Sequence, residues 1–290
     1  MATGSNATAP AEGVYGVGAH DRMRAMTAEH SRAQVQPPSS ATDDHALAAW
    51  LATVAGEELL QVRAAGLEGR ELKDAGDQRS HELLMQLLAT HRPDDAVLSE
   101  EGKDDPARLT ASRVWIVDPV DGTREFSEPP RDDWAVHVAL WADGDLVAGA
   151  VAQPGLGQTF STSEPPYVPA STATRPRIAV SRTRPPAFVQ ALADEIGAEL
   201  VPMGSAGAKV VSVVRDVTDA YVHAGGQYEW DSAAPVAVAR VAGLHTSRAD
   251  GAPLRYNQRD PLLPDLLVCR PELASSITGF VHRYWADEER

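Results

Sequence analysis

The sequence has a single cysteine, Cys269, few aromatic residues and far fewer basic than acidic side chains. One thiol can neither form an internal disulfide nor build a thiolate metal site. Lys and Arg number 26 against 41 Asp and Glu, so the net charge of −15 repels nucleic acids and anionic membranes. No stretch approaches the roughly 18 apolar residues of a membrane span, and no signal-peptide pattern opens the chain. These absences predict a cytoplasmic protein that binds neither nucleic acid nor membrane.

The 290 residues, 43% of them hydrophobic, suffice for a buried core in one large domain or two close-packed smaller ones. Residues 1–41 are rich in Ala, Ser, Thr, Gly and Pro and show no apolar period, which is typical of a disordered leader. Prolines and small polar residues dominate 163–186 and indicate a boundary near 165–176. We therefore expect an N-terminal half at 42–165 and a C-terminal half at 170–288.

Helical and strand-like patterns alternate along both halves, which predicts an α/β fold. The first half is predicted to contain helices from Asp43 to Arg63 and from Gln78 to His91, and strands at 96–98, 113–117, 134–140 and 146–152. An Asp143-Gly144 pair predicts a hairpin turn between the last two strands. In the second half, helices are predicted at 188–196, 206–214 and 232–241, and strands at 177–180, 200–201, 220–222 and 266–269.

Acidic residues follow two of the predicted strands, at the strand ends where α/β sites usually lie. The two segments are Ser99-Glu100-Glu101-Gly102 and Asp118-Pro119-Val120-Asp121-Gly122-Thr123. Pro119 fixes one φ angle and Gly122 permits a tight turn, so both aspartates can converge. The amides that follow open a helix-like start able to hold a phosphate. Hard oxygen ligands without histidine or thiolate companions point to magnesium, although acidic residues at strand ends are often merely solvated.

A third acidic position, Asp231 in Glu229-Trp230-Asp231-Ser232-Ala233-Ala234, heads an Ala-rich helix and would by itself be only a helix cap. As a set, the three segments resemble the magnesium-dependent, lithium-sensitive phosphatase superfamily that contains inositol monophosphatase, fructose-1,6-bisphosphatase and the 3′(2′),5′-bisphosphate nucleotidases. The resemblance covers about residues 43–285 and implies a layered α/β/α/β/α sandwich whose active site lies between the two halves.

The resemblance also implies two or three Mg²⁺ ions and assigns roles by position. The implied metal ligands are Glu100, Asp118, the carbonyl of Val120, Asp121 and Asp231. Thr123, hydrogen-bonded to Asp77, would orient the attacking water, with Glu100 also within reach. The segment before Asp77 departs from the family pattern, because Asp74-Ala75-Gly76 stands where the family usually has a longer loop and a threonine.

Several residues favour the nucleotidase branch. Arg124 follows the Asp-Gly-Thr loop, where bisphosphate nucleotidases typically have a basic residue, and a cation there suits a doubly phosphorylated substrate. His223 stands near the place where inositol monophosphatases present a carboxylate to sugar hydroxyls, and a histidine would not repel a second phosphate. The implied substrate-binding residues are Gly122, Thr123, Arg124, Ser181, Ser205, Lys209, His223 and Asp231.

Other polar residues have a plainer interpretation. His137 lies between apolar residues on a predicted strand and is interpreted as a core or sheet-face residue. Arg131-Asp132-Asp133 is interpreted as a charged turn. A Gly-Ser turn followed by Lys209 would, without the resemblance, indicate only the start of a helix.

The leading hypothesis is removal of the 3′-phosphate of adenosine 3′,5′-bisphosphate to give AMP and phosphate, in sulfur assimilation, by a monomer or homodimer that also accepts 3′-phosphoadenylyl sulfate. One alternative is a phosphatase for inositol monophosphate or fructose bisphosphate. A second is a non-catalytic metal-binding protein that recruits partners through its leader. A silent site has no physical need for five groups of this kind, which argues against the second alternative. They are Glu100, Asp118, Asp121, Thr123 and Asp231.

Overall fold

The computed structural model describes residue 1, residues 43–183 and residues 185–288. The predicted leader at 1–41 lies, apart from its first residue, outside this described part of the chain. Among the described residues, the helices are each too short or too polar to cross a bilayer.

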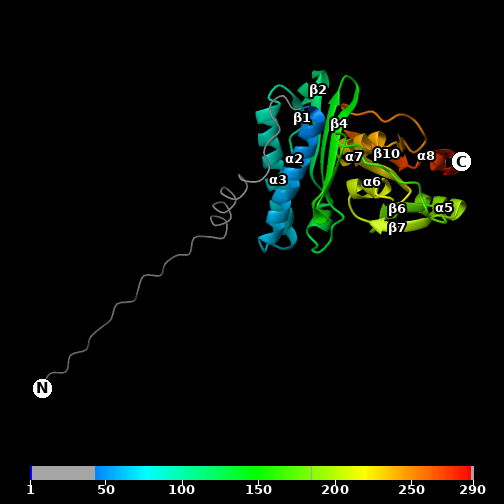
Figure 1. Ribbon diagram of the computed structural model, residues 1–290, viewed down its shortest axis with the longest axis horizontal. Helices are drawn as coiled ribbons and strands as arrows, with labels where there is room; N and C mark the ends of the chain where they lie inside the picture. The colour runs from blue at the N-terminus through cyan, green and yellow to red at the C-terminus, as the bar shows by residue number, and fades with distance from the viewer. Residues whose placement is uncertain (2–42, 184, 289–290) are drawn as a thin grey trace. The chain divides into compact units, whose positions relative to one another are not determined.

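Helices and sheets alternate in five layers (Figure 1). The helices are α2 (Asp44–Ala64), α3 (Gly69–His91), α4 (Thr123–Phe126), α5 (Ala187–Ile196), α6 (Ala206–Val214), α7 (Glu229–Val241) and α8 (Pro271–Glu288), with short 3-10 turns η1 (Pro106–Thr110) and η2 (Pro154–Leu156). The pair α2 and α3 covers the first sheet, α6 and α7 lie between the two sheets, and α5 and α8 cover the second sheet. The predicted α/β/α/β/α sandwich is confirmed.

Each sheet has five strands. The strands are β1 (Ala96–Ser99), β2 (Arg113–Asp121), β3 (Ala135–Ala142), β4 (Asp145–Gln153), β5 (Gln158–Ser161), β6 (Arg177–Ser181), β7 (Glu199–Met203), β8 (Ala220–Tyr228), β9 (His245–Ser247) and β10 (Leu262–Cys269). The first sheet has the order β1-β2-β3-β4-β5 and the second β7-β6-β8-β10-β9. The predicted Asp143-Gly144 turn joins β3 to β4, and both of its residues have positive φ. The boundary between two halves stays a prediction.

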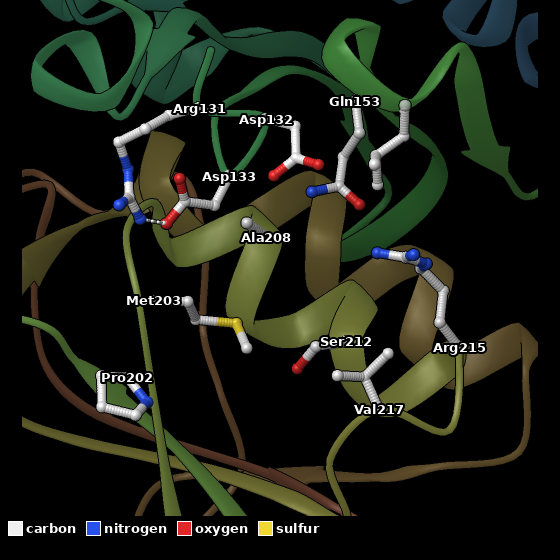
Figure 2. A pocket seen from close by; sticks show the side chains of 11 residues that line it. Arg131, Asp132, Asp133, Gln153, Pro202, Met203, Ala208, Ser212, Arg215 and Val217 are labelled. Carbon is white, nitrogen blue, oxygen red and sulfur yellow. Dashed lines mark hydrogen bonds and ion pairs between the residues drawn. The ribbon is translucent and has the colours of Figure 1, made fainter. Parts of the chain in front are cut away.

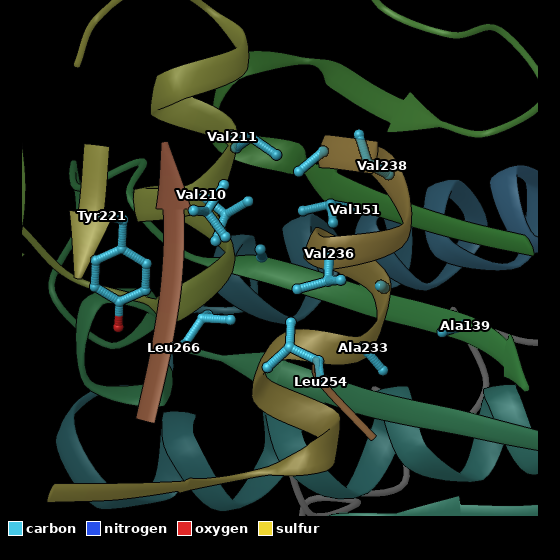
Figure 3. Packing of buried hydrophobic residues seen from close by; sticks show 14 of the residues in the cluster. Ala139, Val151, Val210, Val211, Tyr221, Ala233, Val236, Val238, Leu254 and Leu266 are labelled. Atoms are coloured by element: carbon cyan, nitrogen blue, oxygen red, sulfur yellow. The ribbon is translucent and has the colours of Figure 1, made fainter. Parts of the chain in front are cut away.

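Three apolar cores fill the spaces between the layers. In the central core, valines of α6 and α7 pack between the two sheets (Figure 3). Helix α7 lies very close to β4, because a Cβ atom on Gly149 would stand 2.7 Å from the Cβ of Ala237. Small residues on both elements thus fix the position of α7, whose first turn carries Asp231.

Helix α3 begins at Gly69, well before the predicted start at Gln78. Only a glycine fits at position 76 of this helix, because a Cβ atom there would stand 2.4 Å from a ring carbon of Phe126 in α4. This glycine therefore serves close helix packing rather than a turn. As a result, Asp77 is held in a regular helix that is pressed against α4 and the end of β2.

Candidate metal-binding active site

Three carboxylates converge at the end of β2. Asp118 and Asp121 come from β2 and Asp231 from the first turn of α7, and one oxygen of each lies within 4.8 Å of the others. Asp118 and Asp121 are buried. Carboxylates at this spacing repel one another strongly unless a cation or proton intervenes. The cluster of hard oxygen donors fits a divalent cation such as Mg²⁺.

An irregularity in β2 brings its two aspartates together. In a regular strand, residues three apart point to opposite faces. Here the pairing of β2 with β3 shifts register between Asp118 and Asp121. The amide of Val120 donates to Asp118 Oδ1 over 3.0 Å, and Ser80 donates to the carbonyl of Pro119 over 2.8 Å. Gly122 then turns the chain with a φ of 84°, as the tight-turn prediction required.

The carboxylate of Asp121 is held by the start of α6. Its Oδ2 accepts hydrogen bonds from the hydroxyl of Ser205 over 2.5 Å and the amide of Gly207 over 2.6 Å, while Oδ1 accepts from the amide of Ala206 over 3.1 Å. Burial alone would raise the pKa of Asp121, but the adjacent His137 and these hydrogen bonds lower that pKa to about 2. Asp121 is therefore charged and fixed in orientation.

The other acidic groups at the site bind protons unusually well. Burial, followed by repulsion from Glu100 and Asp121, raises the pKa of Asp118 well above its ordinary value. Burial and the charge of Asp121 raise the pKa of Asp231 to about 7. Desolvation and neighbouring carboxylates raise the pKa of Glu100 to about 7, although this side chain keeps part of its surface in solvent. Such a cluster favours a cation in place of protons.

In EDTA, we expect the Tm to fall as the pH rises from about 5 to about 7.5. The pKa values of Glu100 and Asp231 rise from 4.5 and 3.8 to about 7 on folding. The folded state then holds protons that the unfolded state has lost, and folding becomes less favourable as these protons leave. Saturating Mg²⁺ should remove most of this fall. Differential scanning fluorimetry measures both curves, and a Tm in EDTA that is constant over this range would contradict the cluster's electrostatics.

A hydroxyl and a carboxylate stand beside the cluster. Thr123 Oγ lies 3.3 Å from Asp77 Oδ1 and 3.1 Å from the carbonyl oxygen of Val120. Burial and repulsion from Glu101 raise the pKa of Asp77 to about 6, against the smaller lowering effect of Thr123. Asp77 is thus able to exchange a proton near neutral pH.

The predicted substrate-binding residues occupy varied surroundings. Arg124 lies on α4 with its side chain 56% exposed and pairs with Glu128 over 3.2 Å. Ser181 ends β6, and the imidazole Nε2 of His223 on β8 contacts the carbonyl of Gly226. Lys209 is buried. Its ammonium donates to the carbonyls of Gly204 and Ser205 and lies over the ring of Tyr221. The roles of these residues toward a substrate stay predictions.

An arginine that follows Ser181 shares an acidic partner with Arg124. The guanidinium of Arg182 pairs with Glu125 over 2.6 Å and with Glu128 over 2.7 Å. Glu128 thus lies between two arginines, and the three side chains link α4 to the end of β6. Two arginines, one following a strand of each sheet, thus lie beside the segment that follows the Asp-Gly-Thr loop.

A groove of about 360 Å³ opens beside α6 (Figure 2). Its walls include the ion pair of Arg131 with Asp133, Gln153 at the end of β4, and Ser212 of α6. Asp133 also accepts a hydrogen bond from the amide of Gly204, which precedes the turn that holds Asp121. The groove contains none of the clustered carboxylates, so the site is assigned from the carboxylates rather than from the groove.

The structure gives His137 contacts that its interpretation as a core residue did not include. The ring is completely buried, but Nε2 lies 3.1 Å from Asp121 Oδ2 and Nδ1 lies 3.0 Å from the carbonyl oxygen of Trp230. The sequence offered no local signal for this, since Asp121 reaches His137 through the pairing of β2 with β3, and Trp230 reaches it only when α7 packs on that sheet.

The sequence profile of the inositol monophosphatase family matches residues 44–282. The 3′-phosphoadenosine 5′-phosphate phosphatase of Mycobacterium leprae is 50% identical over 256 residues, which cover 83% of this chain and 94% of that protein. The 3′(2′),5′-bisphosphate nucleotidase CysQ of Escherichia coli is 32% identical over 65% of this chain and 81% of that protein. The crystal structure of CysQ from Bacteroides thetaiotaomicron superposes with a TM-score of 0.66 at 27% identity, covering 78% of this chain and 96% of that one.

Proposed function

The chain belongs to the inositol monophosphatase family, and we propose that it is a metal-dependent phosphomonoesterase that removes the 3′-phosphate of adenosine 3′,5′-bisphosphate, giving AMP and phosphate. The convergence of Asp118, Asp121 and Asp231 carries the proposal. Three carboxylates in one buried cluster are costly to the fold, and binding a divalent cation is the chemistry that offsets this cost.

The proposed ligands extend the described cluster. Glu100, Asp118 and the carbonyl of Val120 would hold one Mg²⁺, and Asp118, Asp121 and Asp231 would hold a second. A third ion stays a prediction. When bound, Mg²⁺ polarises the phosphoryl oxygens, neutralises the leaving oxygen and lowers the pKa of a coordinated water. Glu100 suits its place, because its charge repels that of Asp118 while the side chain remains partly open to solvent.

The protein's own groups complete the reaction. The Thr123 hydroxyl has two acceptors nearby, Asp77 and the Val120 carbonyl, so its hydrogen is engaged and its oxygen is left to accept a hydrogen bond from the attacking water. Asp77 receives the proton through this hydroxyl. Its raised pKa, about 6, makes that transfer more favourable than it would be for an ordinary aspartate.

Two guanidinium groups beside α4 support a doubly phosphorylated substrate. Arg124 is exposed, and Arg182 stands with it around Glu128. Guanidinium groups bind phosphates with paired donors. The relatives from M. leprae and E. coli carry names of phosphatases for such nucleotides, which supports this substrate over inositol monophosphate or fructose bisphosphate and over a non-catalytic role. A cytoplasmic location and a monomeric or dimeric state stay predictions.

Selectivity provides the test of this substrate. We expect Arg124→Ala to lower kcat/KM for adenosine 3′,5′-bisphosphate by about 10- to 10²-fold, the loss of one charge-assisted contact. The kcat/KM for inositol monophosphate should change little, since that substrate has no second phosphate for Arg124 to contact.

The measurement is the ratio of kcat/KM for the two substrates, in Mg²⁺, for wild type and variant. Arg283→Ala is the matched control, because Arg283 is a similarly exposed arginine on α8, the outer helix that covers the second sheet. An unchanged ratio in Arg124→Ala would remove this residue from substrate recognition. A wild-type preference for inositol monophosphate would overturn the nucleotide assignment itself.

A further inference from the structure

His137 touches both segments that carry the carboxylates of the proposed second metal position. Its Nε2 is 3.1 Å from Asp121 Oδ2 at the end of β2. Its Nδ1 is 3.0 Å from the carbonyl oxygen of Trp230, the residue directly before Asp231 in α7. The ring has no solvent exposure. One side chain on β3 therefore contacts both the end of β2 and the first turn of α7.

Both partners of the imidazole are acceptors. The two ring nitrogens face two oxygen atoms: Nδ1 faces the backbone carbonyl of Trp230, and Nε2 faces the carboxylate of Asp121. Because imidazole is rigid, the distance between its two nitrogens is fixed. The ring thus acts as a spacer of set length between Asp121 and the start of α7.

The surrounding residues are shaped for this ring. A Cβ atom on Gly207 would stand 2.0 Å from His137 Nε2, so no other residue at that position of α6 leaves room for the imidazole. The amide of Gly207 donates to the same Asp121 oxygen that faces His137. A glycine inside a helix costs stability, and here it permits both the ring and the amide to reach one carboxylate.

We propose that His137 is a positioning residue of the metal centre, which sets the separation of Asp121 and Asp231 and thereby the affinity for the cation that they share. The inference rests on the proposed metal centre but not on the choice of substrate. Groups that orient metal ligands through hydrogen bonds typically contribute about 10- to 10²-fold to metal affinity.

The test is calorimetric titration of Mg²⁺ into the metal-free protein, which needs no substrate. We expect Mg²⁺ to bind about 10- to 10²-fold more weakly to His137→Leu, which lacks both ring nitrogens. His137→Gln keeps a polar group at this position and should bind Mg²⁺ with intermediate affinity. If the leucine variant does not fold, the glutamine variant alone carries the comparison with wild type. In turnover assays, the Mg²⁺ concentration giving half the maximal rate should shift by the same factor, while kcat at saturating Mg²⁺ changes less.

Val151→Ala is the control for a general loss of stability. Val151 is buried on β4 directly opposite His137, so its truncation destabilises the same place in the sheet. The control should lower the Tm and leave Mg²⁺ affinity unchanged. Equal or tighter Mg²⁺ binding in both His137 variants would overturn the positioning role while the metal centre stands. A wild-type protein that binds no Mg²⁺ would overturn both.

Discussion

Asp118→Asn is expected to lower kcat/KM at least about 10²-fold for every phosphate ester that the enzyme accepts. Asp118 is the carboxylate proposed to bridge two ions, and it is fully enclosed between Glu100 and the two other aspartates. An amide retains the shape of the side chain but brings no negative charge to the cation. The measurement is kcat/KM at saturating Mg²⁺ for adenosine 3′,5′-bisphosphate and inositol monophosphate.

The same variant separates loss of function from loss of structure. Repulsion from Glu100 and Asp121 raises the pKa of Asp118, so removing its charge should leave the Tm in EDTA unchanged or higher at pH 7.5 or so. Asp145→Asn is a suitable control, because Asp145 is an exposed carboxylate in the β3–β4 hairpin, far from this site in the sheet. Undiminished turnover in Asp118→Asn, or a loss confined to one substrate, would contradict its assignment as a shared metal ligand.

Asp77→Asn should lower kcat about 10²- to 10⁴-fold, the usual contribution of a general base. The amide can still contact Thr123 but cannot take the proton of the attacking water. Mg²⁺ affinity should remain close to that of wild type, because the carboxylates of Asp118, Asp121 and Asp231 are intact. Single-turnover rates at saturating Mg²⁺, together with calorimetry, measure the two effects separately.

Thr123→Val provides a cross-check on this pathway for the proton. If Asp77 acts through the hydroxyl, the double variant should be no slower than the slower single variant, because the two groups work as one unit. Independent, multiplying losses would instead show that Asp77 and Thr123 act separately.

The convergence of two of the clustered carboxylates was predictable because their signal is local. Asp118 and Asp121 share one short segment with Pro119 and Gly122, whose backbone preferences indicate the turn directly. The fold followed from the resemblance and from regular apolar patterns in the long helices and strands. Short elements gave too few residues for a period, so β5 and β9 were not predicted.

The features that the sequence did not indicate depend on contacts between distant segments. The sequence around Gly76 did not indicate the start of α3, because a glycine is unusual inside a helix. The structure shows that Gly76 leaves space for the ring of Phe126. Ser205 was predicted to bind substrate. The structure shows that its hydroxyl donates a hydrogen bond to Asp121. The sequence around His137 indicates a core residue, and its polar contacts exist only where β2 and α7 meet β3. A single sequence does not reveal these contacts between distant segments.

Product analysis tests the central claim most directly. Purified protein is incubated with adenosine 3′,5′-bisphosphate in Mg²⁺, and the nucleotide products are separated by chromatography, with a parallel incubation in EDTA. The account predicts adenosine 5′-monophosphate and one equivalent of phosphate with Mg²⁺, and no reaction in EDTA. Release of the 5′-phosphate, turnover that persists in EDTA, or no hydrolysis under conditions where inositol monophosphate is consumed would contradict it.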